Sequence, residues 1–415
     1  MATWLNALKG YLRPKIFLFF FLGLSCGVPL NLLGASFSLW LTKKGIDLEQ
    51  IGFLSLILLP YSLKFLWAPL IDNLCIPFLG KHLGLKKAWG VLFQLGLAGS
   101  LIGFAFAVQA SSQIHSGIYL LGFLCCFFAA SQDIVVDALR IDTLEEEELG
   151  EGAGTYQLGY RIGMLCSGAG LIALSSVISW RLGYLILATL ISIGVLALLF
   201  VKEPTVRKEK SSFTEGIINP FLHYMKTPHW MLILLFIVLY KICNAVLGKM
   251  AMPFYAQNGF TDGEIALVSG TFGPWITMLG IPLGGLLVMR FGILKSLFGL
   301  GFVEITTSVA FAVLAHLGNN LPAFFIVIAF DNIVGGMGGA VFVAFLSSLC
   351  VRAYSATQYA LLSALTMIAT SVFASFSGIL AHAFGWIHFF LLTGLLMFPA
   401  LFVLFYLIRH PLPQK

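Results

Sequence analysis

The sequence predicts an all-α membrane protein with twelve transmembrane helices, and its composition and the length of its apolar segments support this fold class. Of the 415 residues, 59% are hydrophobic and only 10% are charged, whereas a soluble chain is about one quarter charged. The mean hydropathy is +0.96. Apolar segments of about 20 residues recur from Ile16 to Ile408, each long enough to cross a hydrocarbon core about 30 Å thick. They are too long and too continuous for barrel strands, so helices are expected.

The expected spans form two groups of six, separated by the longest polar stretch of the chain. They lie at residues 16–40, 51–71, 88–109, 115–141, 151–177, 180–201, 229–257, 264–289, 293–316, 321–349, 355–383 and 385–408. The first is too long for the apolar core of a signal peptide. We therefore expect an N-terminal half at 1–201, a linker at 202–228 and a C-terminal half at 229–415.

The distribution of basic residues between the spans predicts the orientation of the chain. The outer loops hold only three, Lys43, Lys44 and Arg181. The inner segments hold seventeen: Lys9, Arg13, Lys15, Lys81, Lys86, Lys87, Arg140, Lys202, Arg207, Lys208, Lys210, Lys226, Arg290, Lys295, Arg352, Arg409 and Lys415. Basic residues accumulate on the cytoplasmic side of membranes, so both termini and the linker are expected to be cytoplasmic. Topology also explains the net charge of +6 without any nucleic-acid partner.

The two halves repeat one local pattern. After the second span of each half, a small-residue helix end leads into a short basic loop, at Gly80 and Lys81 in the first half and at Gly285, Arg290 and Lys295 in the second. Parallel repeats of six helices are typical of the major facilitator fold, in which substrate binds near the midplane between the halves. The sequence therefore predicts a major facilitator fold of twelve transmembrane helices in two six-helix halves.

Eight charged residues fall well inside the expected spans. At the centre of a helix each costs about 2.5 to 3.5 kcal/mol on insertion scales, so such residues are functional candidates by default. Structural ion pairing between helices is the alternative for each of them. They comprise four of each sign: Lys64, Asp133, Asp137, Arg161, Lys241, Lys249, Glu304 and Asp331.

The positions of these charges suggest different roles. Asp133 and Asp137 are four residues apart and lie on one helix face, where the mutual repulsion of two carboxylates suits a proton carrier. At about 1.5 Å of rise per residue, Lys64, Asp133 and Arg161 are expected about 12 to 15 Å from the inner surface, with Lys241 and Asp331 nearer the midplane. We assign proton coupling to Asp133, Asp137 and Asp331. Glu304 is interpreted as a structural partner, and Lys241 could instead neutralise Asp331.

Glycines and cysteines in the spans predict packing rather than chemistry. Gly159 and Gly163 form a GxxxG pattern that predicts close helix contact. The glycines between Gly335 and Gly339 indicate either close packing or a flexible point. The seven cysteines have no metal-ligand spacing and are interpreted as small hydrophobic residues. No metal site is predicted, and no motif of an intramembrane protease or zinc enzyme is present, so no catalytic residue is assigned.

Several blocks resemble one family of transporters. They are LKFLWAPLID at Leu63–Asp72, ASQDIVVDALRID at Ala130–Asp142, LGYRIGMLCSG at Leu158–Gly168, IVLYK at Ile237–Lys241, and DNIVGGMGGAVFVAFL with SATQYALLSAL between Asp331 and Leu365. On these blocks the chain resembles the AmpG-type muropeptide permeases of Gram-negative bacteria. The Ser-Gln-Asp block is also similar to that of acetyl-CoA transporters.

The resemblance implies proton-driven uptake of anhydromuropeptides from periplasm to cytoplasm across the bacterial inner membrane, with no cofactor besides the proton gradient. Basic residues would meet peptide carboxylates, and polar side chains would meet sugar hydroxyls. The expected substrate-binding residues are Lys64, Gln132, Gln157, Tyr160, Arg161, Tyr240, Lys241, Asn244 and Asn332. The alternative is another anionic solute, such as an acyl-CoA, a peptide or a sugar conjugate. We expect a monomer surrounded by membrane lipid.

Two features depart from the best-known members of that family. They carry two further helices, whereas this sequence ends after the twelfth expected span. Asn244 also stands where an acidic residue is expected, which could alter proton coupling or substrate choice.

Overall fold

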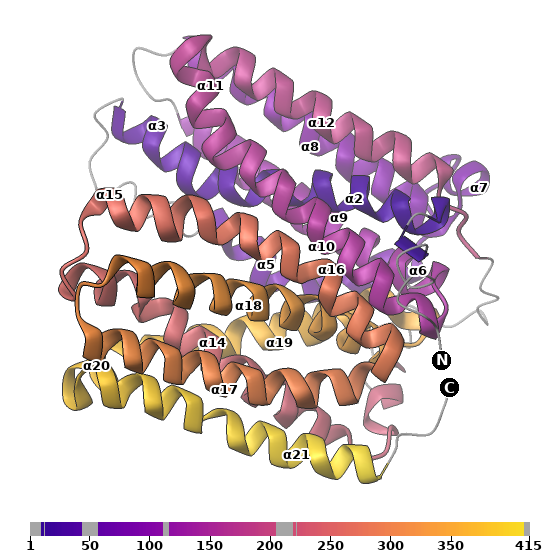
Figure 1. Cartoon of the computed structure of the whole chain (residues 1–415). Helices are drawn as coiled ribbons and strands as arrows, with labels where there is room; N and C mark the ends of the chain where they lie inside the picture. Colours follow the sequence, from indigo (N-terminus) through magenta and orange to yellow (C-terminus); the bar gives the residue numbers. More distant parts are fainter. Residues whose placement is uncertain are drawn as a thin grey trace. The chain divides into compact units, whose positions relative to one another are not determined.

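The computed structural model describes residues 10–11, 13–43, 57–110, 116–204, 219–220 and 222–410. Every regular element within these ranges is a helix (Figure 1). Eleven helical segments among them are long and apolar enough to cross a membrane, and the predicted all-α membrane fold class is confirmed. The remaining predicted span, 51–71, lies partly outside the described residues. From Ile57 onward it consists of short helices, including α5 (Leu59–Leu63), a 3₁₀ turn (Lys64–Leu66) and α6 (Ala68–Asn73).

The chain divides into two compact units. The N-terminal unit contains Leu8–Pro220 together with Ser347–Ala364, and the C-terminal unit contains Phe221–Leu346 together with Leu365–Lys415. The division after Pro220 falls within the predicted linker, most of which, residues 205–218, lies outside the described part of the chain. The predicted half boundaries at 201 and 229 remain predictions.

The helices of the N-terminal unit begin and end within a few residues of the predicted spans. They are α2 (Pro14–Asn31), α3 (Phe37–Lys43), α7 (Leu79–Leu83), α8 (Leu85–Ala110), α9 (Ser116–Thr143), α10 (Leu149–Leu165), α11 (Leu171–Val177) and α12 (Trp180–Phe200). Side chains that accept hydrogen bonds from backbone amides mark the start of two of these helices. The Ser179 side chain accepts the Leu182 amide at the start of α12, and the Glu203 carboxylate accepts the amides of Lys86 and Lys87 at the start of α8. Both contacts satisfy amides that a helix end leaves without a partner.

Helices α2 and α10 contact each other through their backbones. A Cβ atom added to Gly23 or Gly27 of α2 would overlap the carbonyl oxygen of Tyr156 or Tyr160, and one added to Gly159 or Gly163 of α10 would overlap carbonyls of α2. The predicted close packing at Gly159 and Gly163 is therefore confirmed. Helices in lipid associate through such close van der Waals contact.

Beyond the glycine contact, each of these helices passes through a π-helical turn, at Leu32–Ser36 after α2 and at Cys166–Gly170 after α10. Side chains of the first helix bond to carbonyls of the second. Asn31 Nδ2 donates to the Met164 carbonyl at 3.0 Å, and Ser36 Oγ donates to the Ser167 carbonyl at 2.6 Å. Carbonyls at and just before the second π-helical turn thus have hydrogen-bond partners inside the protein, as lipid surroundings require.

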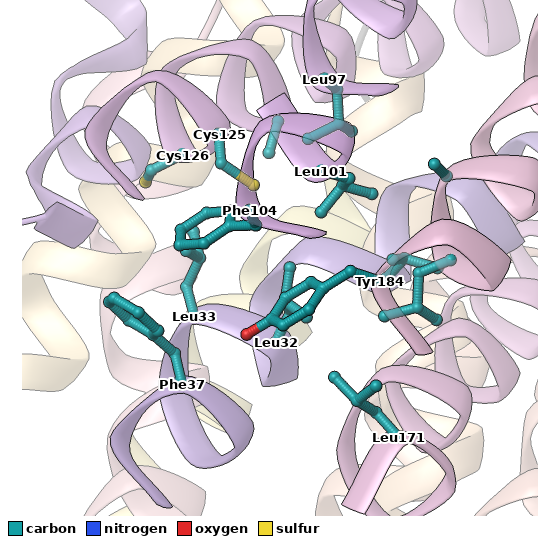
Figure 2. Close-up of a cluster of buried hydrophobic side chains, with 14 of the residues drawn as sticks. Leu32, Leu33, Phe37, Leu97, Leu101, Phe104, Cys125, Cys126, Leu171 and Tyr184 are labelled. Atoms are coloured by element: carbon teal, nitrogen blue, oxygen red, sulfur yellow. The ribbon is translucent and has the colours of Figure 1, made fainter. Parts of the chain in front are cut away.

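Figure 2 shows the apolar core of the N-terminal unit, in which residues of α2, α3, α8, α9, α11 and α12 meet. The Phe104 ring stacks on Tyr184 with ring centres 5.4 Å apart, and Phe37 meets Phe104 edge-on at 5.2 Å. Cys125 and Cys126 are fully buried here. They behave as the small hydrophobic residues that the sequence predicts.

The C-terminal unit contains α14 (Trp230–Gln257), α15 (Asp262–Ile265), a π-helical turn (Ala266–Phe272), α16 (Gly273–Phe291), α17 (Ile293–Leu317), α20 (Ser377–Leu395), α21 (Met397–Arg409) and most of α18 (Leu321–Leu349) and α19 (Ser355–Ser375). In Figure 1, α17 and α21 lie side by side. Gly385 adopts φ +69° and interrupts α20, at the point where the predicted spans 355–383 and 385–408 meet. A positive φ is readily adopted only by glycine.

The structure supports close packing, one of the two roles that the sequence left open, for one glycine between Gly335 and Gly339. A Cβ on Gly336 of α18 would overlap the Thr277 carbonyl of α16, so this glycine permits close packing. Gly335 and Gly339 have nothing within 4 Å of an added Cβ.

Candidate functional site

The two acidic residues of α9 lie in different surroundings. Asp133 is 6% exposed and Asp137 is 4% exposed. The Asp137 carboxylate is 2.9 Å from Nη2 of Arg140, one turn along the same helix. Asp133 forms no ion pair with any residue that the structure describes, and its Oδ1 is buried without a hydrogen-bond partner. Within this pair, therefore, Asp137 is neutralised locally and Asp133 is not.

Arg140 is completely buried, although the sequence predicts a place for it among the basic residues of the inner segments. Its guanidinium carbon lies 4.7 Å from the centre of the Tyr156 ring and 5.4 Å from that of Tyr359. Nη2 donates to Ser347 Oγ at 3.3 Å, while Nε and Nη1 lack hydrogen-bond partners. Stacking on aromatic faces suits the planar guanidinium better than an ammonium group.

Lys64 supplies the positive charge that acts most strongly on Asp133. It is 5% exposed and lies in the 3₁₀ turn between α5 and α6. Three groups that can carry a proton, the Cys26 thiol and the hydroxyls of Tyr61 and Tyr160, lie close enough to interact electrostatically with Asp133. The structure thus brings together Lys64, Asp133 and Tyr160 from the predicted site, and adds Cys26 and Tyr61.

The other predicted residues of the N-terminal unit differ in exposure. Gln132 is fully buried, and its Nε2 donates to the Ser25 carbonyl at 3.1 Å while its Oε1 has no partner among the described residues. On α10, Gln157 is partly buried and Arg161 is exposed. Arg161 is therefore the accessible cation of this group, and Gln132 serves at least as a contact between α9 and α2.

A second buried cluster of charges surrounds Lys86, at the start of α8. Its Nζ lies 2.6 Å from Asp142 and 3.3 Å from Asp72, and it donates to Ser355 Oγ at 2.6 Å. Asp72 also accepts the amide and the hydroxyl of Thr357, at 2.8 and 2.7 Å. Asp72 thereby caps the first turn of α19, where a negative charge is favoured by the helix dipole.

In the C-terminal unit, Glu304, for which the sequence predicts a structural role, interacts with Lys241. Glu304 of α17 is 2% exposed, and Lys241 is the charge that acts on it most strongly. Asn244 Nδ2 donates to Glu304 Oε1 at 3.2 Å, and Glu304 Oε2 is buried without a hydrogen-bond partner. Lys241 Nζ lies 4.5 Å from the centre of the Phe342 ring. Lys241 therefore interacts electrostatically with Glu304.

Three further predicted residues lie on α14 and α18. Asp331 is partly exposed and forms no ion pair within the described ranges. Asn332 accepts from Thr277 Oγ1 at 2.7 Å and donates to the Ile328 carbonyl at 2.9 Å. Tyr240 is fully buried and donates to the Leu297 carbonyl at 3.4 Å. Asn332 and Tyr240 thus connect helices, and their substrate-binding roles remain predictions.

No group of three His, Cys, Asp or Glu residues in the described part of the chain could hold a metal ion. The polar groups that the structure does assemble are single carboxylates beside lysines, tyrosines and amides. Such groups can accept and release protons or bind an anion, and both units contain them.

Comparison with known proteins gives concordant results. The sequence profile of the Major Facilitator Superfamily matches residues 16–260. A Rickettsia conorii protein that carries the transporter name AmpG 4 is 35% identical over 401 residues, which cover 95% of this chain and 96% of that protein. The anhydromuropeptide permease of Escherichia coli K12 is 33% identical over 400 residues, covering 96% of this chain and 80% of the permease.

Solved structures of more distant proteins share the fold. The E. coli fucose:proton symporter FucP superposes with a TM-score of 0.69 at 15% identity, covering 96% of this chain and 99% of the symporter. The proton:xylose symporter XylE superposes with a TM-score of 0.68 at 12% identity, covering 98% and 97%.

Proposed function

We propose a specific transport reaction for this chain, which belongs to the Major Facilitator Superfamily and, within it, to the AmpG permeases. Membership of this family makes it a multi-pass membrane transporter of a small molecule, not an enzyme. The proposed reaction is import of anhydromuropeptides from the periplasm to the cytoplasm through the bacterial inner membrane, driven by protons. The observation that carries the choice of substrate is the likeness to the E. coli anhydromuropeptide permease along nearly the whole chain.

Proton coupling is assigned to Asp133 on the basis of its surroundings. Arg140 neutralises Asp137 at 2.9 Å, so Asp137 is held as an ion pair. Asp133 has no such partner, and Lys64 balances its charge only from a distance. Burial without a close ion pair favours the protonated form of a carboxyl, and the charge of a lysine within electrostatic range reduces the cost of the ionised form. Asp133 can therefore gain a proton when open to one side and release it on the other, while Asp137 holds its charge throughout.

Substrate recognition is assigned to the accessible polar residues of each unit. Arg161 of α10 is exposed and can meet a peptide carboxylate, and Gln157 and Tyr160 on the same helix can meet sugar hydroxyls. In the C-terminal unit, Lys241 supplies a second cation. We further propose that one chain is sufficient for transport, which detergent-solubilised protein tests by its mass in solution.

The proposal is tested by uptake of labelled anhydromuropeptide into right-side-out vesicles with an imposed pH gradient. Accumulation should require the gradient, and Asp133→Asn should abolish accumulation yet leave exchange of substrate across the membrane. Asp262→Asn, a change at an exposed carboxylate on α15, is the matched control and should transport normally. Gradient-independent accumulation, or normal accumulation by Asp133→Asn, would contradict proton coupling through this residue. Uptake of an acyl-CoA or an unrelated sugar conjugate in place of the muropeptide would contradict the substrate.

The proposed orientation is tested separately. A reporter enzyme active only in the periplasm should be silent when fused after Gln414 and active when inserted at Asn258, because the basic residues predict cytoplasmic termini. A periplasmic signal from the Gln414 fusion would rule out twelve spans with both termini inside.

A further inference from the structure

A pocket of about 750 Å³ lies where three membrane spans of the N-terminal unit end at the same level. Its lining comes from Pro14, Lys15 and Leu18 at the start of α2, Thr143 at the end of α9, and Phe200–Lys202 at the end of α12. The corresponding spans are Pro14–Asn31, Gly117–Thr143 and Trp180–Phe200. The pocket is thus at the depth of lipid headgroups, and its size falls in the range of about 300 to 1,000 Å³ typical of small-molecule sites.

The lining combines an apolar wall with cations. Phe200 is 73% exposed, although it is a large aromatic residue, and the partly buried Leu18 adds to the apolar lining. Lys202 is exposed and forms no ion pair within the described ranges. Thr143 Oγ1 has no hydrogen-bond partner among those residues.

Lys15, the second lysine of the pocket, pairs with a carboxylate that also pairs with Arg13. Lys15 Nζ lies 2.7 Å from Glu148, and Arg13 Nη1 lies 3.2 Å from the other oxygen of the same carboxylate. Glu148 ends the 3₁₀ turn Glu146–Glu148, and Glu151 in the first turn of α10 also interacts electrostatically with Arg13. Glu148 and Glu151 therefore offset the charges of Arg13 and Lys15. Lys202 adds a positive charge that forms no ion pair with any described carboxylate.

We propose that this pocket binds an anionic phospholipid, with the headgroup phosphate at Lys202, Lys15 and the Thr143 hydroxyl and an acyl chain along Phe200 and Leu18. Basic pockets between helix ends attract anionic headgroups, and an acyl chain covers apolar surface that would otherwise remain in contact with water at the interface. Free phosphate would use the cations but leave the apolar wall uncovered. The proposal does not depend on which solute the protein transports.

The test is titration of the full-length protein in detergent with dioleoylphosphatidylglycerol, followed by native mass spectrometry. The protein should bind this lipid more tightly than dioleoylphosphatidylcholine. One surface lysine contributes about fivefold to the affinity for an anionic headgroup, so Lys202→Gln should lose about fivefold and the double change with Lys15→Gln about 25-fold. Lys295→Gln removes an exposed lysine at the end of a different span and should have no effect.

Two further variants separate the site from general surface charge. Lys202→Arg keeps the cation and should retain the affinity, whereas Leu18→Trp fills the apolar part of the pocket without changing the charge and should weaken binding. Equal binding of the two lipids, an equal loss in Lys295→Gln, or full competition by inorganic phosphate would overturn the proposal. Replacement of residues 205–218 by a Gly-Ser segment of the same length should leave the affinity unchanged; an increase above about tenfold would show that the linker occupies the pocket instead.

Discussion

The two units of the molecule hold their buried charges in different ways. Six close ion pairs lie in the N-terminal unit. There Lys86 lies between Asp72 and Asp142, and Arg140 lies beside Asp137. In the C-terminal unit, Glu304 is bound instead by the amide of Asn244 and keeps one buried oxygen without a hydrogen-bond partner.

This difference separates charges held in close ion pairs from Glu304, a buried carboxyl for which the described residues supply no close ion pair. A buried ion pair is costly to break because removal of one partner leaves the other charge in a medium of low dielectric constant. A buried carboxyl without a close cation can be neutral, and its replacement by an amide removes no pair. Substitutions in the N-terminal pairs should therefore lower stability, whereas substitutions at Glu304 and Lys241 should alter transport.

The largest expected loss of stability follows from Arg140→Met. Methionine fills much of the space between Tyr156 and Tyr359 but leaves Asp137 without its cation, which should lower the free energy of unfolding by about 3 to 5 kcal/mol. Denaturant unfolding in detergent micelles measures the change. Adding Asp137→Leu to Arg140→Met should recover most of the loss, because no unpaired charge then remains. A loss below about 1 kcal/mol in the single variant would show that the pair is not structural.

Lys241→Gln should affect transport more than stability. Removing one partner of a buried charge interaction costs about 2 to 5 kcal/mol, and we expect a cost of this size in uptake of a muropeptide that carries its peptide. A fragment with sugar alone lacks the peptide carboxylates and should lose much less. If Lys241 serves only to balance Glu304, both substrates will suffer equally and the double change with Glu304→Gln will restore transport. Initial uptake rates of the two labelled fragments distinguish these results.

Glu304→Gln tests whether the buried carboxyl of the C-terminal unit contributes to stability as the paired carboxylates of the N-terminal unit do. An amide at this position can still accept the hydrogen bond from Asn244, and it removes a buried charge that has no close ion pair. The free energy of unfolding should therefore be unchanged or higher, within about 1 kcal/mol. Asp142→Asn, at an equally buried carboxylate of the N-terminal unit, provides the comparison and should be clearly destabilising. A similar loss in both variants would remove the distinction drawn between the two units.

The smallest effect is expected at the surface of the N-terminal unit. Arg352 pairs with Glu145 at 3.1 Å, but the two side chains are 45% and 64% exposed. Exposed pairs of this kind contribute about 0 to 1 kcal/mol, so Arg352→Gln should change the free energy of unfolding by no more than that. Unfolding at low and high salt should show that even this small contribution is screened. If Arg352→Gln lowered the free energy of unfolding as much as Arg140→Met, burial would not be what determines the strength of these ion pairs.

The fold was predictable because its main signals are local. Hydropathy over about 20 residues identifies a span without knowledge of its neighbours, and even the break at Gly385 falls where two predicted spans meet. The charges themselves were also predictable, since a charged residue within an apolar segment is conspicuous.

The partners of these charges were not predictable from local patterns. Asp72 and Thr357 are 285 residues apart in sequence, and Arg140 and Ser347 are 207 apart. Residue spacing along one helix could have indicated the pair Asp137 and Arg140, which are three residues apart. The contact between Asn244 and Glu304 joins α14 to α17, so it depends on how these helices pack. The sequence shows that Asn244 stands where an acidic residue is expected, but it does not show that the Glu304 carboxylate lies beside Asn244.

The backbone contact between α2 and α10 limits how these two helices can move. Four glycines, two on each helix, bring the chains so close that neither helix can slide or rotate against the other without a collision of backbone atoms. Over this length we expect the two helices to move together. The turns that follow, Leu32–Ser36 and Cys166–Gly170, already interrupt the regular α-helical hydrogen bonds, and the Ser36 hydroxyl donates to the Ser167 carbonyl between them, so bending in a transport cycle is expected there first.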